Sequence, residues 1–214
     1  MLEKLPDAIG HALQGVRAGL ENTVFNQSGL RAGMAAIDVG SLAFADHAPI
    51  PMRYTADGSG LSPPLHWRGV PPGTASVVLV VEDADAPTPR PLVQAIVVDL
   101  PADPEGALPE GALTSPDHYS DAVHEGRNSF LSAAWLPPDP PPGHGPHRYV
   151  FQVFALGGLA HGDDLGSTPG REAVTDAVQA RGLASGCLVG TYERHDTRVR
   201  TGEAVPTAEA LRTA

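Results

Sequence analysis

Two carboxylates, spaced for ligand binding or acid–base chemistry, follow a run of five consecutive aliphatic residues, Val77–Val81. Such a run is typical of a strand covered on both faces, because a strand with one wet face alternates between apolar and polar residues. Asp83 and Asp85 follow the run, before Pro87. If the extended geometry continues that far, both carboxylates lie on one face. The alternative is a turn in which they cap local backbone N–H groups.

A histidine and a tyrosine begin another predicted strand further along the chain. His147 and Tyr149 share one face of the segment 147–156 if it is extended. Gln94 is a lone amide among apolar neighbours in the predicted strand 92–100. A buried amide needs hydrogen-bond partners, so Gln94 either bonds neighbouring backbone or lines a pocket. A histidine at a strand end often makes a single backbone contact, so His147 alone does not define a site.

Several common catalytic and metal-binding patterns do not occur in the sequence. It contains no G-x-S-x-G elbow, and no glycine-rich phosphate loop precedes a predicted helix. The single cysteine, Cys187, lies in a predicted strand with apolar neighbours, which favours an inert buried thiol. The histidines in or beside the long loop match no standard metal site; they are His118, His124, His144 and His147. The sequence therefore predicts no catalytic residue, metal or cofactor.

Composition restricts the partners of this chain. It has 214 residues, of which 42% are hydrophobic and 18% charged, and a formal net charge of −11, values that predict one soluble globular domain. The negative charge argues against nucleic acid and anionic membranes, which need basic patches, whereas a small anion can be held locally. Residues 1–25 lack a signal-peptide pattern, and no apolar run could span a membrane. We expect a cytoplasmic protein without stable membrane insertion.

Apolar residues at helical spacing predict an amphipathic helix over residues 5–22. Its apolar stripe consists of Leu5, Ile9, Leu13, Val16 and Leu20. The opposite face is not basic, so we expect the helix to pack on the domain or on a second copy of the chain. A homodimer is one way to cover the stripe. Residues 26–40, rich in Gly and Ala, are predicted to be a connector.

Short strands separated by turns are predicted for most of the remaining chain, in keeping with the 24 Gly and 22 Pro of the whole sequence. Residues 101–145 contain no long predicted strand or helix, and irregular stretches of that length are often functional. A last strand is predicted over 187–194. The pattern indicates a mainly β protein, an antiparallel β-sandwich with one helix near each end.

The second of these helices has clear start and stop signals. Thr168 is its predicted N-cap, with Pro169 at the first helical position, and it is predicted to end at about Arg181, before Gly182. The residues predicted to face inward are Ala173, Val174, Ala177 and Val178.

An ordered set of short motifs resembles the phosphatidylethanolamine-binding protein (PEBP) family, and in particular its bacterial Raf kinase inhibitor-like branch. The motifs are Asp57-Gly58, Ser62-Pro63-Pro64-Leu65-x-Trp67, Gly69-x-Pro71-x-Gly73-Thr74-x-Ser76, Asp83-x-Asp85-Ala86-Pro87, a Pro-rich segment and Gly145-Pro146-His147-Arg148-Tyr149. The segment Gly190–Arg194 also matches. The resemblance covers roughly residues 40–195 and leaves an N-terminal helix and connector, 1–39, and a tail, 196–214, outside the β-sandwich.

The resemblance implies a small pocket that accepts phosphate- or phospholipid-head-group-like anions. The residues it places there are Asp83, Asp85, Pro87, Gln94, Trp135, Pro138, His147 and Tyr149. The family usually has His-Trp where this chain has Gln94-Ala95, and commonly Tyr in place of Trp135. Glutamine is always neutral, whereas imidazole can be a cation, so the pocket is expected to hold an anion less strongly or to prefer another ligand.

We therefore expect a non-enzymatic binding protein for small anionic or lipid-like ligands. The carboxylates are expected to orient His147 and favour its charged form, and Arg148 is expected to point to the opposite face. Two alternatives remain. One is an interaction protein that inhibits a protease or kinase, and the other is a hydrolase that uses Asp83, Asp85 and His147 as acid–base groups.

Overall fold

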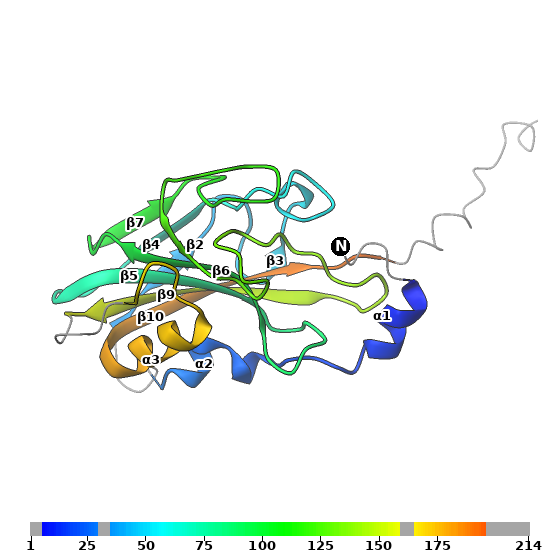
Figure 1. The fold of residues 1–214 in the computed structure, drawn as a ribbon, viewed down its shortest axis with the longest axis horizontal. Coiled ribbons are helices and arrows are strands. Elements are labelled where there is room, and N and C mark those ends of the chain that lie inside the picture. Colours follow the sequence, from blue (N-terminus) through cyan, green and yellow to red (C-terminus); the bar gives the residue numbers. More distant parts are fainter. Residues whose placement is uncertain (1–5, 30–34, 159–164, 196–214) are drawn as a thin grey trace, which may run out of the picture.

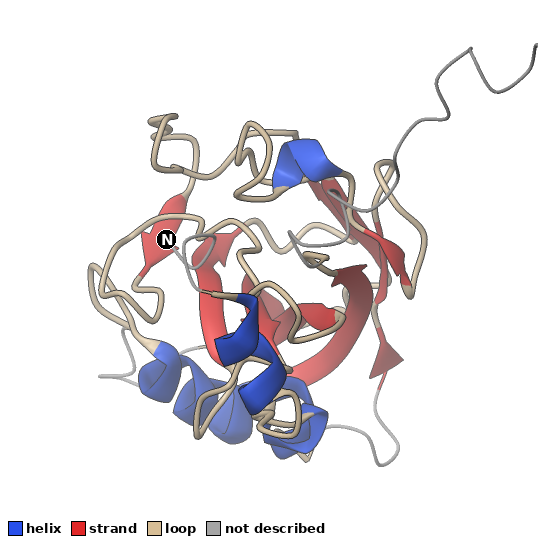
Figure 2. Cartoon of the chain, turned by 90° about the vertical axis from the view of Figure 1, so that its right-hand side faces the viewer, coloured by secondary structure: helices blue, strands red, loops and turns tan. Residues whose placement is uncertain are grey.

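The computed structural model describes residues 6–29, 35–158 and 165–195, which form two packed β-sheets with helices against one outer face (Figures 1 and 2). The larger sheet has the order β1-β10-β9-β5-β6-β8, with β3 also beside β10, and the smaller has the order β2-β4-β7. The strands of the larger sheet are β1 (Ala35–Ala36), β3 (Ala48–Pro49), β5 (Thr74–Asp83), β6 (Leu92–Leu100), β8 (His124–Gly126), β9 (His147–Gly157) and β10 (Gly182–Tyr192). The smaller sheet contains β2 (Asp38–Gly40), β4 (Leu65–Arg68) and β7 (Glu105–Leu108).

The predicted fold class is confirmed: the chain is mainly β, and most strand pairs are antiparallel. The exceptions are β1 and β3, which both run parallel to β10. The helices are α1 (Asp7–Leu13), α2 (Val24–Gln27) and α3 (Arg171–Arg181), with 3-10 turns at Leu20–Asn22 and Met52–Tyr54. Between 101 and 145 only the short strands β7 and β8 form, as the sequence predicts.

Strand β5 lies at the centre of the larger sheet and contributes to two apolar cores. Val77, Leu79 and Val81 face the smaller sheet, in the core between the two sheets. Val78 and Val80 face the helices, where Val174 and Val178 of α3 pack in the same cluster. Each such side chain contributes about 1.5–3 kcal/mol when fully buried. The continuous aliphatic run therefore marks a strand covered on both faces, as predicted.

Helix α3 ends as predicted, with Gly182 as its C-cap, but it begins two residues later than Pro169, at Arg171. The reason is that the backbone before it is already paired with the segment around β8. The carbonyl oxygen of Pro169 accepts from Arg127 N, and that of Thr168 accepts from Arg127 Nε. Of the residues predicted to face inward, Val174 and Val178 are buried and Ala177 is partly buried, whereas Ala173 is exposed.

The single N-terminal helix predicted over 5–22 is wrong in its extent. Helix α1 ends at Leu13, and the chain then runs along the loop after β5, where Ala18 N and Gly19 N donate to the carbonyl oxygens of Ala86 and Ala84. Gly19 has φ +92°, a conformation that favours glycine and interrupts a helix. The predicted connector 26–40 instead contains the end of α2, β1 and β2.

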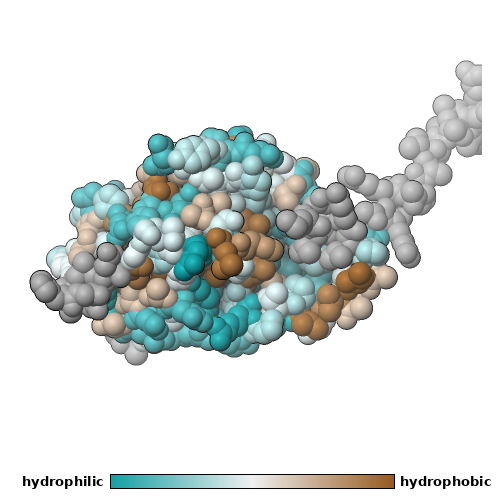
Figure 3. Space-filling model, in the orientation of Figure 1, coloured by the Kyte–Doolittle hydropathy of each residue, from teal (hydrophilic) through white to brown (hydrophobic). Residues whose placement is uncertain are grey.

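The apolar stripe of the predicted helix is only partly covered by the domain. Ile9 and Val16 are 41% and 46% exposed, and Leu5 lies outside the described residues. Hydrophobic residues form small separate patches on the face shown in Figure 3, one of them toward the end of the molecule that carries α1. The homodimer stays a prediction. No helix in the described parts of the chain is both long and apolar enough to cross a bilayer.

A buried ionic network joins the central strand to the helices. Glu82, which is fully buried, accepts from Arg171 Nε at 2.6 Å, from Gln152 Nε2 at 2.9 Å and from Val24 N at 2.8 Å. A buried carboxylate is tolerated only when it is paired in this way. The network therefore fixes α2 and α3 to β5 and β9.

Replacing Glu82 by alanine should lower the free energy of unfolding by about 3 kcal/mol, because it leaves the Arg171 cation largely buried without its counter-charge. Glu172→Ala is the matched control. Glu172 pairs with Arg90 at 3.3 Å, and both side chains are exposed, so its loss should change stability by less than about 0.5 kcal/mol. Urea denaturation measures both. Equal losses in the two variants would show that the network does not stabilise the fold.

Candidate functional site

The predicted site residues meet where β5 ends and β9 begins. Asp83 is the last residue of β5 and lies opposite Tyr149 in the antiparallel β5–β9 pair. His147 is the first residue of β9, and its Nδ1 lies 2.8 Å from Asp83 Oδ2. The two buried ends of neighbouring strands thus place an imidazole and a carboxylate in direct contact, with the carboxylate orienting the ring.

A second histidine extends this contact into a chain of hydrogen bonds. His144 Nδ1 lies 2.7 Å from His147 Nε2, and His144 Nε2 lies 2.8 Å from the carbonyl oxygen of Leu13. A carbonyl oxygen can only accept, so we assign the proton of His144 to Nε2, which leaves Nδ1 as an acceptor. His147 then donates from Nε2 to His144. On the other side of the ring, His147 Nδ1 lies against the Asp83 carboxylate.

The surroundings of His144 favour this assignment. Burial, followed by the neighbouring charge of His147, lowers the pKa of His144 below its usual value. His144 is therefore neutral at physiological pH and able to accept a hydrogen bond from His147 Nε2. Sequence reasoning noticed His144 only as one of several histidines near the long loop. Its spacing of three residues from His147 was the available signal.

Asp85 does not share a face with Asp83, because the strand ends at Asp83 and the chain turns. Asp83 Oδ1 accepts from Asp85 N at 2.9 Å, the local backbone cap that was the alternative interpretation. The Asp85 carboxylate instead pairs with Arg148, through Nε and Nη2 at 2.7 Å each, and with Arg17 at 3.1 Å. Arg148 thus points away from His147, as predicted.

Three polar atoms at this end of β5, β6 and β9 are buried without a hydrogen-bond partner among the described residues. They are Tyr149 OH, Trp135 Nε1 and Gln94 Oε1. Burial, followed by the charge of Asp83, raises the pKa of Tyr149 well above its usual value, so its hydroxyl stays protonated. The Leu136 N–H donates to the backbone carbonyl oxygen of Gln94, which places Trp135 beside β6. Such orphaned atoms are uncommon and mark places where a ligand or water can bind.

The site is closed to solvent in this structure. His147 is 1% exposed and Tyr149 0%. Much of the cover is the Pro-rich segment, in which Pro138 is buried, while Pro87 is only partly buried. The N-terminal segment lies across the end of this cover, where Gln14 Nε2 donates to the carbonyl oxygen of Gly143 at 2.7 Å.

Arginine side chains hold the cover in place. Arg17 donates to the carbonyl oxygens of His144 and Pro146. Arg194, which is buried, pairs with Asp57 at 2.8 Å and with Asp139 at 2.7 Å. Both Asp57 and Arg194 belong to the motifs that carry the family resemblance, but nothing in their spacing along the chain predicts that they pair. The Asp139–Arg194 pair ties the Pro-rich segment to the residues just after β10, and the Asp57–Arg194 pair ties the loop around Asp57 to the same place.

The carboxylates and histidines of the described residues do not gather into a metal-ligating cluster. No group of three or more His, Cys, Asp or Glu side chains in this part of the chain could hold a metal ion. The two carboxylates are also engaged, Asp83 with His147 and Asp85 with two arginines. The arrangement offers hydrogen-bond donors rather than a free base.

The family model for phosphatidylethanolamine-binding proteins matches residues 40–193, and the chain therefore belongs to this family. Among relatives, a UPF0098 protein of Aquifex aeolicus is 35% identical over 177 residues, 82% of this chain and 99% of the relative. A UPF0098 protein of Methanothermobacter thermautotrophicus is 34% identical over 152 residues, 71% of this chain and 95% of the relative. Membership indicates a binding protein.

Solved structures agree with this assignment. A putative PEBP homologue from Chlamydia trachomatis is 31% identical, with a TM-score of 0.64, and the match covers 74% of this chain and 98% of that one. Escherichia coli YbcL, described as a member of the mammalian PEBP family, is 29% identical, also with a TM-score of 0.64, over 74% of this chain and 99% of its own. Both share the fold described above.

The paired carboxylate of Asp85 makes a prediction about acid stability. Burial alone would raise the pKa of Asp85, but the hydrogen bonds from Arg148 and Arg17 outweigh it and lower this pKa. The ionised Asp85 carboxylate therefore stabilises the folded state fully above its unfolded-state pKa of about 3.9. This stabilisation is lost as the pH falls through the lower folded-state pKa. Asp85→Asn should cost roughly 2 kcal/mol at pH 7, and the difference from wild type should shrink below about pH 4.

Urea denaturation at pH 7 and pH 3 measures this difference. Asp38→Asn is the control, because Asp38 and its partner Arg68 are exposed and their pair contributes little. A difference between Asp85→Asn and wild type that is as large at pH 3 as at pH 7 would contradict the assignment.

Proposed function

We propose that this protein binds a phosphate or phosphate-ester group at the Asp83–His147 site, without chemical turnover. The observation that carries the proposal is the buried His147 ring, held through Nδ1 by Asp83 while Nε2 carries a hydrogen that a ligand could accept. Two further orphaned donors, Tyr149 OH and Trp135 Nε1, lie at the same end of the strands. Three donors and no free base suit an anion better than a hydrolytic reaction.

The anion takes the place of His144 in this proposal. His144 is the present acceptor of the His147 Nε2 hydrogen, and an anionic oxygen is a stronger acceptor than a neutral imidazole. For the anion to enter, His144 must turn away and give up its bond to the Leu13 carbonyl oxygen. Binding therefore competes with the closed arrangement of the N-terminal segment, and the measured affinity includes the free energy of opening.

The same competition makes binding depend on pH. The pKa of His144 lies below the usual histidine value of about 6.5. His144 therefore becomes protonated only when the pH falls below that usual value. Protonated His144 can no longer accept from His147, so the closed state loses a hydrogen bond and the positive charge of the site increases. Anion binding is expected to strengthen as the pH falls through this range.

Removing the His144 side chain should strengthen anion binding. In His144→Ala, the His147 hydrogen has no internal acceptor, so we expect inorganic phosphate to bind about tenfold more tightly than to wild type and with less pH dependence. His147→Ala should abolish binding. Backbone amide NMR shifts, titrated with phosphate and with O-phosphoethanolamine between about pH 5.5 and 8, measure the affinities around the histidine pKa and compare a free phosphate with a head-group-like ester.

The control is His118→Ala, which removes an exposed histidine elsewhere in the chain. Saturable shifts around Asp83 and His147 that tighten in His144→Ala support the proposal. No saturable shifts in either wild type or His144→Ala at any pH would exclude an anion site here.

A further inference from the structure

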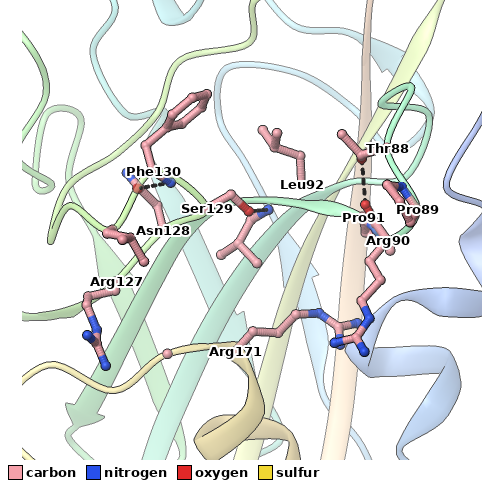
Figure 4. Close-up of a pocket in the computed structure, with 13 residues that line it drawn as sticks. Thr88, Pro89, Arg90, Pro91, Leu92, Arg127, Asn128, Ser129, Phe130 and Arg171 are labelled. Atoms are coloured by element: carbon pink, nitrogen blue, oxygen red, sulfur yellow. Dashed lines mark hydrogen bonds between the residues drawn. The ribbon is translucent and has the colours of Figure 1, made fainter.

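A separate open groove lies beside the start of β6 (Figure 4). It has a volume of about 740 Å³ and is lined mainly by apolar surface. One wall is the segment 88–91, the other is the segment 127–131, and Leu92 and Val93 lie between them. No residue predicted for the Asp83–His147 site lines it, so its occupancy is independent of the function proposed above.

One wall of the groove is a loop built around a buried asparagine. Asn128 Oδ1 accepts from Phe130 N at 2.9 Å and from Ser132 N at 3.2 Å, and its Nδ2 donates to the Ala134 carbonyl oxygen at 3.0 Å. These bonds use both ends of the amide to fix the backbone. The loop therefore holds the side chains of Phe130 and Leu131, two and three positions after Asn128, in a defined place.

Those two side chains are large, apolar and exposed. Phe130 is 57% and Leu131 77% exposed, and each adds little to the core. Leu131 also has φ +63°, a conformation that is unfavourable for a residue with a branched side chain. Neither the backbone conformation nor the exposure to solvent favours leucine at this position. Backbone strain of this kind is often found at binding sites.

The groove is bordered by positive charge in a chain whose net charge is −11. In the view of Figure 4, Arg90 and Arg171 lie on one side of the groove and Arg127 on the other. Arg171 is engaged with buried Glu82, whereas Arg90 makes a single 3.3 Å contact with exposed Glu172. Arg127 donates through Nε to the Thr168 carbonyl oxygen. Arg90 and Arg127 therefore remain able to pair with carboxylates of a ligand.

We propose that this groove binds an acidic peptide segment of a partner protein, with an aromatic or aliphatic side chain of the peptide packed against Phe130, Leu131 and Leu92. The arginines select the charge, and the exposed apolar pair supplies the kind of contact that dominates protein interfaces. A peptide fits the groove better than a bilayer, because a flat membrane surface would leave the concave floor at Leu92 and Val93 uncovered.

The test begins with a phage-displayed library of random heptapeptides selected on the full chain. Enriched peptides are synthesised with a fluorescent label, and their binding is measured by fluorescence anisotropy. We expect enrichment of Asp and Glu around one aromatic or aliphatic residue. No enrichment, or enrichment of neutral or basic peptides, would overturn the proposal.

Variants separate binding from folding. Leu131→Gly suits the positive φ, so its unfolding midpoint should equal or exceed that of wild type, while peptide affinity falls at least about tenfold. Arg127→Glu should weaken binding similarly. The matched controls are Leu42→Gly and Arg68→Glu, which change an exposed leucine and an exposed arginine outside the groove. Full affinity in Leu131→Gly and Arg127→Glu would overturn the proposal.

Two further measurements test other occupants. Flotation with vesicles of phosphatidylcholine and phosphatidylglycerol that depends on Phe130 and Leu131 would assign the surface to a membrane instead. Self-association that is lost in Leu131→Gly, measured by sedimentation velocity, would assign it to a second copy of the chain. Either result would overturn the peptide proposal, and neither bears on phosphate binding at His147.

Discussion

The contact between Asp83 and His147 is the constraint around which this end of the molecule is arranged. Both side chains are buried, and a charged group in that environment must have its hydrogen bonds satisfied by protein. The carboxylate satisfies one nitrogen of the ring and His144 the other, and His144 in turn needs the Leu13 carbonyl oxygen. The hydrogen bonds that satisfy the imidazole of His147, the first residue of β9, thus fix the position of the N-terminal segment.

Central features of the fold could be predicted from the sequence because they depend on local pattern. The aliphatic run before Asp83 predicted a strand covered on both faces, and Gly182 predicted the end of α3. The start of α3 could not be predicted, since the backbone around Thr168 and Pro169 pairs with Arg127, a contact between residues about 40 positions apart. The N-terminal helix was predicted too long because apolar periodicity carries no information about tertiary contacts. It does not show that Gly19 adopts a positive φ, or that the carbonyl oxygens of Ala84 and Ala86, after β5, accept hydrogen bonds from this segment.

The candidate site, too, could be predicted only in part from the sequence. Family resemblance identified Asp83, His147, Tyr149 and the substitution at Gln94, and the structure brings these residues to one end of the larger sheet. It could not reveal that Asp85 turns toward Arg148, nor that His144 occupies the second nitrogen of His147, because both depend on side-chain directions set by tertiary packing. Gln94 is consistent with a closed site, since a neutral amide is buried more easily than an imidazolium.

The segments that close the site are synthesised at different times. Gln14 and Arg17 contact the backbone of Gly143 and Pro146, partners 129 positions later in the chain. At translation rates of about 5–20 residues per second, the N-terminal segment is synthesised roughly 6–26 s before those partners. Asp83 likewise precedes His147 by 64 positions. The nascent chain therefore carries an uncovered strand end and an unattached N-terminal segment until more than two thirds of it has been made, an interval in which a chaperone could bind either one.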